Sequence, residues 1–231
     1  TYDLVYQKSG DDSNFRNSNI ENFKLASEYL ISKGYHVIRM GKTVADSLNI
    51  QNDKFIDYAK SNYKNDFLDI FLASHCSLFL TTGAGLDVIA SIFNKPIVLV
   101  GCTQIAWTRS SNKKQLTIYK HFKNNKTGKY LSLNDIFSYN LALSEKDKCF
   151  EDKNIELIEN SSEEIRDAVK DMLNLIENNF ELNIENKLIH ENFWKIFKKN
   201  IDKFNCSHIH ANFFKSHVGY NFLKKNNYFL N

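Results

Sequence analysis

The sequence predicts an α/β fold in which helices cover both faces of a parallel sheet, followed by a helical tail. Short β-rich apolar runs alternate with capped amphipathic segments between residues 19 and 178. The segment Leu78–Val100 has the pattern of strand, loop, helix and strand that forms part of a βαβ unit. Hydrophobic residues make up 42% of the chain and aromatic residues 13%, as in a folded globule. The predicted boundaries are 1–180 for the α/β domain and 181–231 for the tail.

Length and cysteine content restrict the class of protein. A chain of 231 residues can bury one core, with or without an appended helical piece. No apolar stretch approaches the roughly 20 residues that span a bilayer, and no signal segment begins the chain, so we expect a cytoplasmic protein. The four cysteines have no paired spacing, which predicts reduced thiols. A start at Thr1 suggests a processed chain or a part of a longer one.

The first predicted element is a helix over 19–33. Ser18 and Glu21 form a capping-box pattern, apolar residues then recur at helical spacing, and Gly34 suits the end of the helix. The β-rich residues that follow predict a strand over 35–39.

Two helices are predicted next. Phe55, Ile56 and Ala59 suggest a short helix. Asn65 suits the cap of a second helix. Its buried face is expected to consist of Phe67, Leu68, Ile70, Phe71 and Leu72.

Strands are predicted over 77–80 and 97–100, with a helix over 85–93 between them. We expect both strands to lie parallel to strand 35–39 in one sheet, covered by helices 19–33 and 85–93. Later predicted elements are a loop containing Trp107 and Arg109, strands over 116–119 and 155–158, a helix over 131–137, and a helix from the capping box Ser161–Glu164 to about Asn178.

The tail is predicted to form helices over 184–201 and 211–225. We expect the first to dock through Phe193, Trp194 and Phe197, because this cluster would otherwise be an exposed apolar patch. From Lys187 onward there are eight lysines and two acidic residues, a net charge of +6, which leaves −3 for the remainder. A solvated helix face is the preferred interpretation, and contact with nucleic acid or anionic lipid is the alternative.

The loop Thr82-Gly83-Ala84-Gly85-Leu86-Asp87 is the main candidate site. Its glycines can adopt positive φ, and the free N–H groups of Gly85, Leu86 and Asp87 at a helix start would suit a phosphate or carboxylate. Arg39 and Lys42 follow a predicted strand, where cations can oppose phosphate oxygens. The loop lacks the third glycine of a dinucleotide fingerprint, so a tight turn selected for packing is the alternative interpretation.

Histidines and cysteines give weaker signals. Cys206, His208 and His210 alternate in a way that would place them on one side of a strand, where zinc is one interpretation and a polar linker the preferred one. His36 and His121 are interpreted as structural.

Several segments together resemble a family of bacterial glycosyltransferases of surface polysaccharide synthesis. These segments are Phe15–Phe23, Gly34–Gly41, Thr82–Asp87 with Lys95–Val98, and Ile155–Ile165, in the order that the family has them. Phe15 and Asn19 depart from the family's pattern of Tyr and Asp at those positions.

The resemblance implies a Rossmann-like domain, the nucleotide-binding half of a GT-B enzyme. It would transfer a sugar from a nucleotide diphosphate sugar to a glycan or lipid-linked acceptor, with no cofactor and no obligatory metal. The implied substrate-binding residues are Arg16, Arg39, Lys42, Thr82, Gly83, Ala84, Gly85, Leu86 and Asp87.

The resemblance also implies an N-terminal domain that is missing here, so the catalytic base and the acceptor site stay unassigned. The basic tail is a candidate for contact with that domain or with the inner membrane surface. The alternatives are a nucleotide-sugar epimerase, whose domains are built alike, and a non-catalytic module that binds nucleotides, glycans or RNA.

Overall fold

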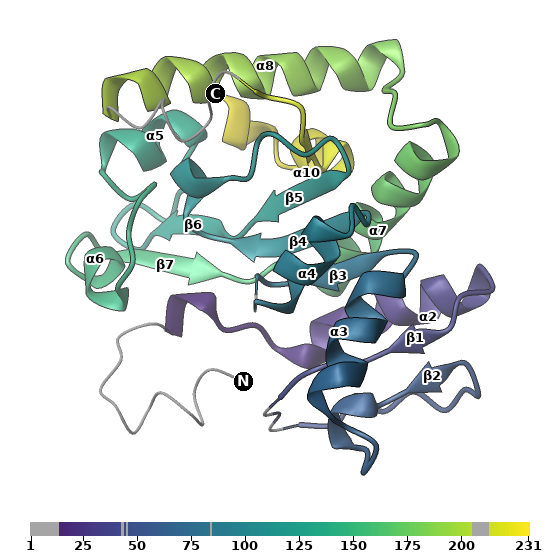
Figure 1. The fold of residues 1–231 in the computed structure, drawn as a ribbon. Helices are drawn as coiled ribbons and strands as arrows, with labels where there is room; N and C mark the ends of the chain where they lie inside the picture. Colours follow the sequence, from purple (N-terminus) through teal and green to yellow (C-terminus); the bar gives the residue numbers. More distant parts are fainter. Residues whose placement is uncertain (1–13, 43, 45, 84, 205–212) are drawn as a thin grey trace.

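The centre of the molecule is a four-stranded parallel sheet with strand order β3-β4-β5-β8. The strands are β3 (Phe79–Thr81), β4 (Ile97–Cys102), β5 (Gln115–Tyr119) and β8 (His217–Val218). Helices flank the sheet, which confirms the α/β class (Figure 1). The strands expected over 77–80, 97–100 and 116–119 are thereby confirmed. This computed structural model describes residues 14–42, 44, 46–83, 85–204 and 213–231.

Side chains of the central strand β4 alternate between two covered faces. Val98 and Val100 belong to the main core, to which the adjoining helix α7 (Ser162–Glu177) also contributes. Leu99 points to the other face, where its Cδ1 lies 3.5 Å from the position that a Cβ on Gly83 would take. On this face, α4 (Leu86–Ile92) contacts β3 and β4. Figure 1 shows α4 in front of the sheet and α7 behind it.

The expectation that strand 35–39 joins this sheet is wrong. β1 (Val37–Ile38) instead pairs in parallel with β2 (Phe55–Ile56) in a separate two-stranded sheet. The helix expected over Phe55–Ala59 is wrong for the same reason, because the backbone of β2 is paired with β1. A single 3₁₀ turn, η4 (Tyr58–Lys60), follows β2.

The helix expected over 19–33 is confirmed as η3 (Ile20–Phe23) continuing into α2 (Lys24–Ser32). Its cap is different from the expected Ser18. The Asn19 side chain accepts a hydrogen bond from the Glu21 N–H at 3.0 Å, while the Asn19 N–H donates to the carboxylate of Glu159 at 2.8 Å. A distant carboxylate thus replaces the Glu21 side chain of the predicted capping box.

The helix α3 (Asp66–His75) begins at Asn65, whose side chain accepts from the Leu68 N–H at 2.9 Å, as expected. Its expected buried face is wrong, because Phe67 is 72% exposed and Phe71 43% exposed. Small residues are buried instead, including Ala73 on α3, which packs against α4.

A second pair of strands, β6 (His121–Asn124) and β7 (Ile155–Ile158), is antiparallel. The chain between them forms α5 (Leu133–Ser138) and α6 (Asp147–Glu151). The strand over 155–158 and the helix near 131–137 are confirmed, as is the capping box Ser161–Glu164 at the start of α7.

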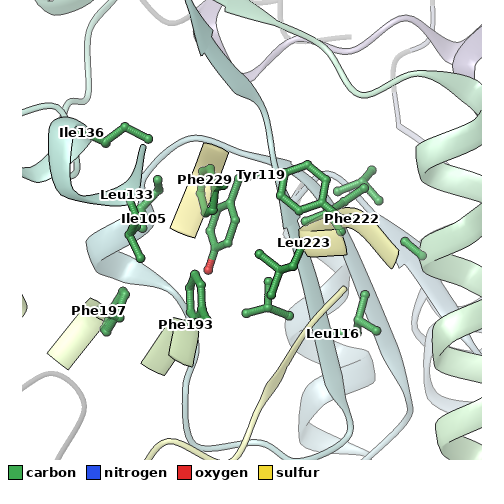
Figure 2. Packing of buried hydrophobic residues seen from close by; sticks show 14 of the residues in the cluster. Ile105, Leu116, Tyr119, Leu133, Ile136, Phe193, Phe197, Phe222, Leu223 and Phe229 are labelled. Carbon is green, nitrogen blue, oxygen red and sulfur yellow. The ribbon is translucent and has the colours of Figure 1, made fainter. Parts of the chain in front are cut away.

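The tail packs into the core through its aromatic residues. The helix α8 (Ile184–Ile201) is confirmed, and both Phe193 and Phe197 are fully buried. Phe193 stacks on Tyr119 of β5, with ring centroids 5.9 Å apart, and Figure 2 shows these rings beside Phe229. Docking through Phe193, Trp194 and Phe197 is therefore confirmed.

The helix expected over 211–225 is only partly confirmed. Within the described residues, His217–Val218 is the strand β8, because its backbone pairs with β5, and α10 (Tyr220–Lys225) follows. Short 3₁₀ segments η6 (Asp202–Phe204) and η7 (Asn227–Leu230) complete the tail. The domain boundary at residue 180 stays a prediction.

None of the helices in the described parts of the chain combines the length and the apolar character needed to cross a membrane.

Candidate functional site

The glycine loop follows β3 at the carboxyl edge of the central sheet. Gly83 has a φ of +86° and Gly85 a φ of +93°, so the expected positive φ values are confirmed. A Cβ on Gly85 would meet no atom within 4 Å. The loop therefore leaves open space at the edge where ligands of parallel α/β sheets bind. Ala84 lies outside the described residues.

A buried carboxylate organises the helix start after the loop. Oδ1 of Asp87 accepts a hydrogen bond from the Gly85 N–H at 2.9 Å. The expectation of a free N–H at Gly85 is therefore wrong, because the chain's own Asp87 already occupies that donor. Asp87 thus acts as an internal partner of the loop, whereas the sequence suggested that its N–H would contact a ligand.

The second oxygen of Asp87 pairs with a cation that sequence reasoning did not select. Its Oδ2 lies 2.5 Å from Nη1 of Arg109, and the side-chain exposures are 1% for Asp87 and 41% for Arg109. Arg109 follows β4, so the pair joins the ends of two adjacent strands. A guanidinium has five N–H donors, and the exposed part of Arg109 retains donors for an anion. The position of Arg109 in a loop after a strand was the available signal.

Arg16 lies at the carboxyl end of β4 as well. Its Nη2 is 3.4 Å from Oε1 of Gln104, which follows β4, and its guanidinium is 5.2 Å from the ring centre of Phe15. Arg16 is exposed. The structure thus brings a residue of the first motif to the edge that carries the glycine loop.

The segment around Arg16 is fixed by two buried or half-buried polar contacts. Nζ of Lys120, at the end of β5, donates to the carbonyl oxygen of Asn17 at 2.5 Å. Burial lowers the pKa of Lys120, although Glu159 and Asp147 raise it. The carboxylate of Asp147 also accepts from the Phe15 N–H at 2.6 Å. These contacts hold Arg16 in place without using its guanidinium.

Arg39 and Lys42 lie elsewhere, after β1 of the second sheet. Nη1 of Arg39 is 3.0 Å from Oδ2 of Asp57, and only 9% of the Arg39 side chain is exposed. The Lys42 side chain is exposed, and its carbonyl oxygen accepts from Nζ of Lys64 at 2.6 Å. Sequence reasoning selected Arg39 and missed Asp57, so a diphosphate would have to share Arg39 with this carboxylate.

The remaining predicted residues stay at the loop. Thr82 is half-buried and Leu86 is the first residue of α4. The structure therefore brings together Arg16 and the loop residues at the ends of β3 and β4, and adds Arg109 to them. Arg39 and Lys42 are held by the separate β1–β2 sheet.

The histidine and cysteine signals do not form a second site within the described residues. No group of three His, Cys, Asp or Glu residues there is arranged to hold a metal ion. Cys206, His208 and His210 lie outside the described residues. Both ring nitrogens of His121 are engaged, with the Tyr228 hydroxyl at 2.5 Å and Glu164 at 2.9 Å, which fits a structural role.

Comparisons of the chain with models of known protein families, with curated proteins and with solved structures gave no match.

Proposed function

We propose that this chain is the donor-binding part of a GT-B glycosyltransferase, which transfers a sugar from a nucleotide diphosphate sugar to a glycan or lipid-linked acceptor. One observation carries the proposal: an open glycine turn lies at the carboxyl edge of a parallel sheet, and the buried Asp87 holds the half-exposed Arg109 beside it. This combination suits a diphosphate, which needs close approach to the backbone and planar cationic donors.

The chemistry of sugar transfer explains why such cations would be useful. As the bond between the sugar and the diphosphate breaks, negative charge develops on the departing phosphate oxygens. In the proposal, Arg109 and Arg16 stabilise this charge, because fixed donors are most effective where charge develops in the transition state. The exposed Lys42 and the paired Arg39 are secondary candidates for the same anion.

In the proposal, the acceptor is bound by the N-terminal domain that the resemblance implies. The proposed setting is the cytoplasm, at the inner membrane surface where a lipid-linked acceptor would be held. The described tail residues from Lys187 onward supply basic side chains, such as Lys195 and Lys198, that are exposed and therefore suited to an anionic surface.

Of the alternatives, an RNA-binding module could not use the aromatic cluster of α8 for stacking. Phe193, Trp194 and Phe197 are at most 7% exposed, so they are not accessible for stacking on bases. A nucleotide-sugar epimerase would use the same donor contacts, and the products formed from a nucleotide sugar distinguish it from a transferase.

The test is a thermal-shift and calorimetric screen of nucleoside diphosphates and their sugar conjugates. A ligand at 100 times its dissociation constant should add roughly 2.7 kcal/mol to the free energy of unfolding. Loss of the charge-assisted hydrogen bonds of Arg109 should weaken binding by about 10- to 100-fold, equivalent to about 1.5–3 kcal/mol. If no member of the panel binds, the proposal is wrong.

The variant that tests Arg109 must not leave the buried carboxylate of Asp87 without a partner. Removing Arg109 alone would strand the Asp87 carboxylate, so the informative variant is the double substitution Arg109→Ala with Asp87→Asn, which keeps an acceptor for the Gly85 N–H. Lys126→Ala combined with Asp152→Asn, at an exposed lysine in the turn after β6 and an exposed aspartate after α6, is the charge-matched control. Equal affinity of the double variant and the control would remove Arg109 from the site.

A further inference from the structure

Two adjoining hollows lie on the side of the molecule away from the glycine loop. Their volumes are about 560 and 380 Å³, and the residues that they share include Asn174, Asn186 and Tyr220. They lie between the second half of α7 and the starts of α8 and α10. The larger one also reaches Tyr35, which precedes β1 of the two-stranded sheet.

Five side-chain amides contribute to the polar lining of the hollows, those of Asn174, Asn178, Asn183, Asn186 and Asn221. Each amide has a hydrogen-bond donor and an acceptor. Asn186 is 4% exposed, yet its Oδ1 has no hydrogen-bond partner among the described residues. Because the Oδ1 atom is itself covered, a ligand in the hollow can pair with it only after a small shift of the side chain, and this pairing removes the cost of a buried polar group without a partner.

The charges around the hollows balance. Three lysines line them, Lys33, Lys170 and Lys224, and so do three carboxyl groups, Asp171, Glu177 and Glu181. Two of the lysines are also paired with carboxylates of their surroundings, Lys170 with Asp167 at 3.3 Å and Lys224 with Glu185 at 2.9 Å. Because Asp167 and Glu185 add negative charge beside the hollows, the hollows present no strong positive charge to a ligand even where burial keeps Asp171 protonated.

Asp171 lines the larger hollow. It is fully buried, and its Oδ2 accepts from the Asn221 N–H at 3.0 Å at the start of α10. The Tyr220 hydroxyl accepts from Nδ2 of Asn174 at 3.0 Å. Hydrogen bonds between α7 and α10 thus hold these lining side chains, so their arrangement is formed before a ligand binds.

We propose that these hollows form a binding site for a neutral saccharide. A sugar ring carries several hydroxyl groups that both donate and accept hydrogen bonds, and closely spaced amides match them. The combined space suits about one or two sugar rings, within the usual range of ligand pockets. Tyr35 and Leu173 add apolar surface for the C–H face of a ring. A nucleotide or phosphate would instead require an excess of positive charge.

This saccharide site does not depend on the proposed donor site. The test is saturation-transfer NMR with the full chain and methyl glycosides of glucose, galactose, mannose, N-acetylglucosamine and N-acetylgalactosamine at millimolar concentrations. We expect saturation transfer to at least one of these probes. Addition of a nucleoside diphosphate should leave the signal unchanged, because the two sites share no residue.

Two variants and a control locate the signal. Asn186→Leu replaces the buried amide by an apolar side chain with the same branching and number of heavy atoms, and Asn178→Trp covers the smaller hollow from an exposed position. Both should weaken binding by about 3- to 10-fold, the loss expected for a hydrogen bond. Asn227→Ala, an exposed asparagine that lines neither hollow, should bind as the parent does.

Two results would overturn the inference: no saturation transfer to any probe, or unchanged binding in both Asn186→Leu and Asn178→Trp when their melting temperatures match that of the parent. The Arg109→Ala, Asp87→Asn double variant should lose nucleotide binding and keep saccharide binding, so failure of one site is distinguishable from failure of the other.

Discussion

Asp87 and Arg109 form an ion pair at 2.5 Å in which the carboxylate is buried and the Arg109 side chain is 41% exposed. The same carboxylate accepts from the Gly85 N–H. One side chain therefore contacts both the backbone of the loop and the cation beside it. Because the Arg109 side chain is partly exposed, the ion pair places a cation at the surface next to the loop.

Asp87 should be more important for stability than its position on a short helix suggests. Asp87→Ala leaves the Gly85 N–H without its acceptor and Arg109 without its partner, so we expect a loss of about 1–3 kcal/mol in the free energy of unfolding. Asp87→Asn retains an acceptor oxygen and should lose less. Urea unfolding measures both, and an equal loss in the two variants would show that the hydrogen bond to Gly85 contributes nothing.

Gly85 offers a test that separates backbone strain from ligand contact. Gly85 and Gly34 both have φ of +93°, and a Cβ on either would meet no atom within 4 Å. Alanine at either position should therefore destabilise the fold through backbone strain and not through a clash, and the strain should be larger at Gly85, whose ψ of −44° lies outside the left-handed helical region. Only Gly85→Ala should also weaken nucleotide binding, because only this Cβ enters the proposed site. Equal affinity of the two variants would contradict the role of the loop.

The parts of the fold that follow from local signals could be predicted from the sequence. Asn65 begins α3 and the Ser161–Glu164 capping box begins α7, because each cap depends only on neighbouring backbone groups. The partner of β1 could not be predicted, because strand pairing depends on segments distant in sequence. Phe55–Ile56 was the missing partner, and its short apolar pattern fits a helix equally well.

The candidate site also combines features that could be predicted from the sequence with features that could not. Positive φ at Gly83 and Gly85 was predictable from residue type. The pairs Asp87–Arg109 and Arg39–Asp57 were not, because an ion pair leaves no pattern in the sequence when its members lie on different elements. The carboxylate partner and the exposure of a cation decide whether it is available to an anion. Arg109 is therefore the main candidate for the anion, and Arg39 is a secondary one.

Exposure distinguishes two phenylalanines that the helical pattern treats alike. Phe67 on α3 is 72% exposed and Phe197 on α8 is fully buried. Phe197→Ala should therefore cost about 3–5 kcal/mol in the free energy of unfolding, because it leaves a cavity in the core. Phe67→Ala should change this free energy by no more than about 0.5 kcal/mol. A large loss for Phe67→Ala would mean that α3 is buried by an interaction outside the described residues.

Two buried ionisable groups should make opposite contributions to the pH dependence of stability. Burial, and next the neighbouring His190, lower the pKa of His217 to about 4. Burial raises the pKa of Asp171 to about 7, against the hydrogen bonds from Asn221 and Tyr220 that lower it. Each shift corresponds to at most about 3–5 kcal/mol between the two protonation states.

The sign of each contribution follows from which state binds more protons. Between about pH 6.5 and 4 the unfolded chain protonates His217 and the folded chain does not, so this contribution to stability is lost as pH falls. Between about pH 4 and 7 the folded chain keeps a proton on Asp171 that the unfolded chain releases, so this contribution is lost as pH rises. The two largely cancel in the parent protein.

Single substitutions should expose each contribution. Asp171→Asn removes the contribution of Asp171. The free energy of unfolding of this variant relative to the parent should therefore rise as pH increases from about 4 to 7. His217→Leu removes the contribution of His217. The stability of this variant relative to the parent should fall as pH increases over nearly the same range. Groups such as Glu164, whose pKa is lowered by hydrogen bonds from His121 and Asn226 despite its burial, affect all three proteins equally and cancel in the difference. Urea unfolding across this range measures the two differences, and parallel pH profiles for the parent and both variants would show that neither group titrates differently in the folded state.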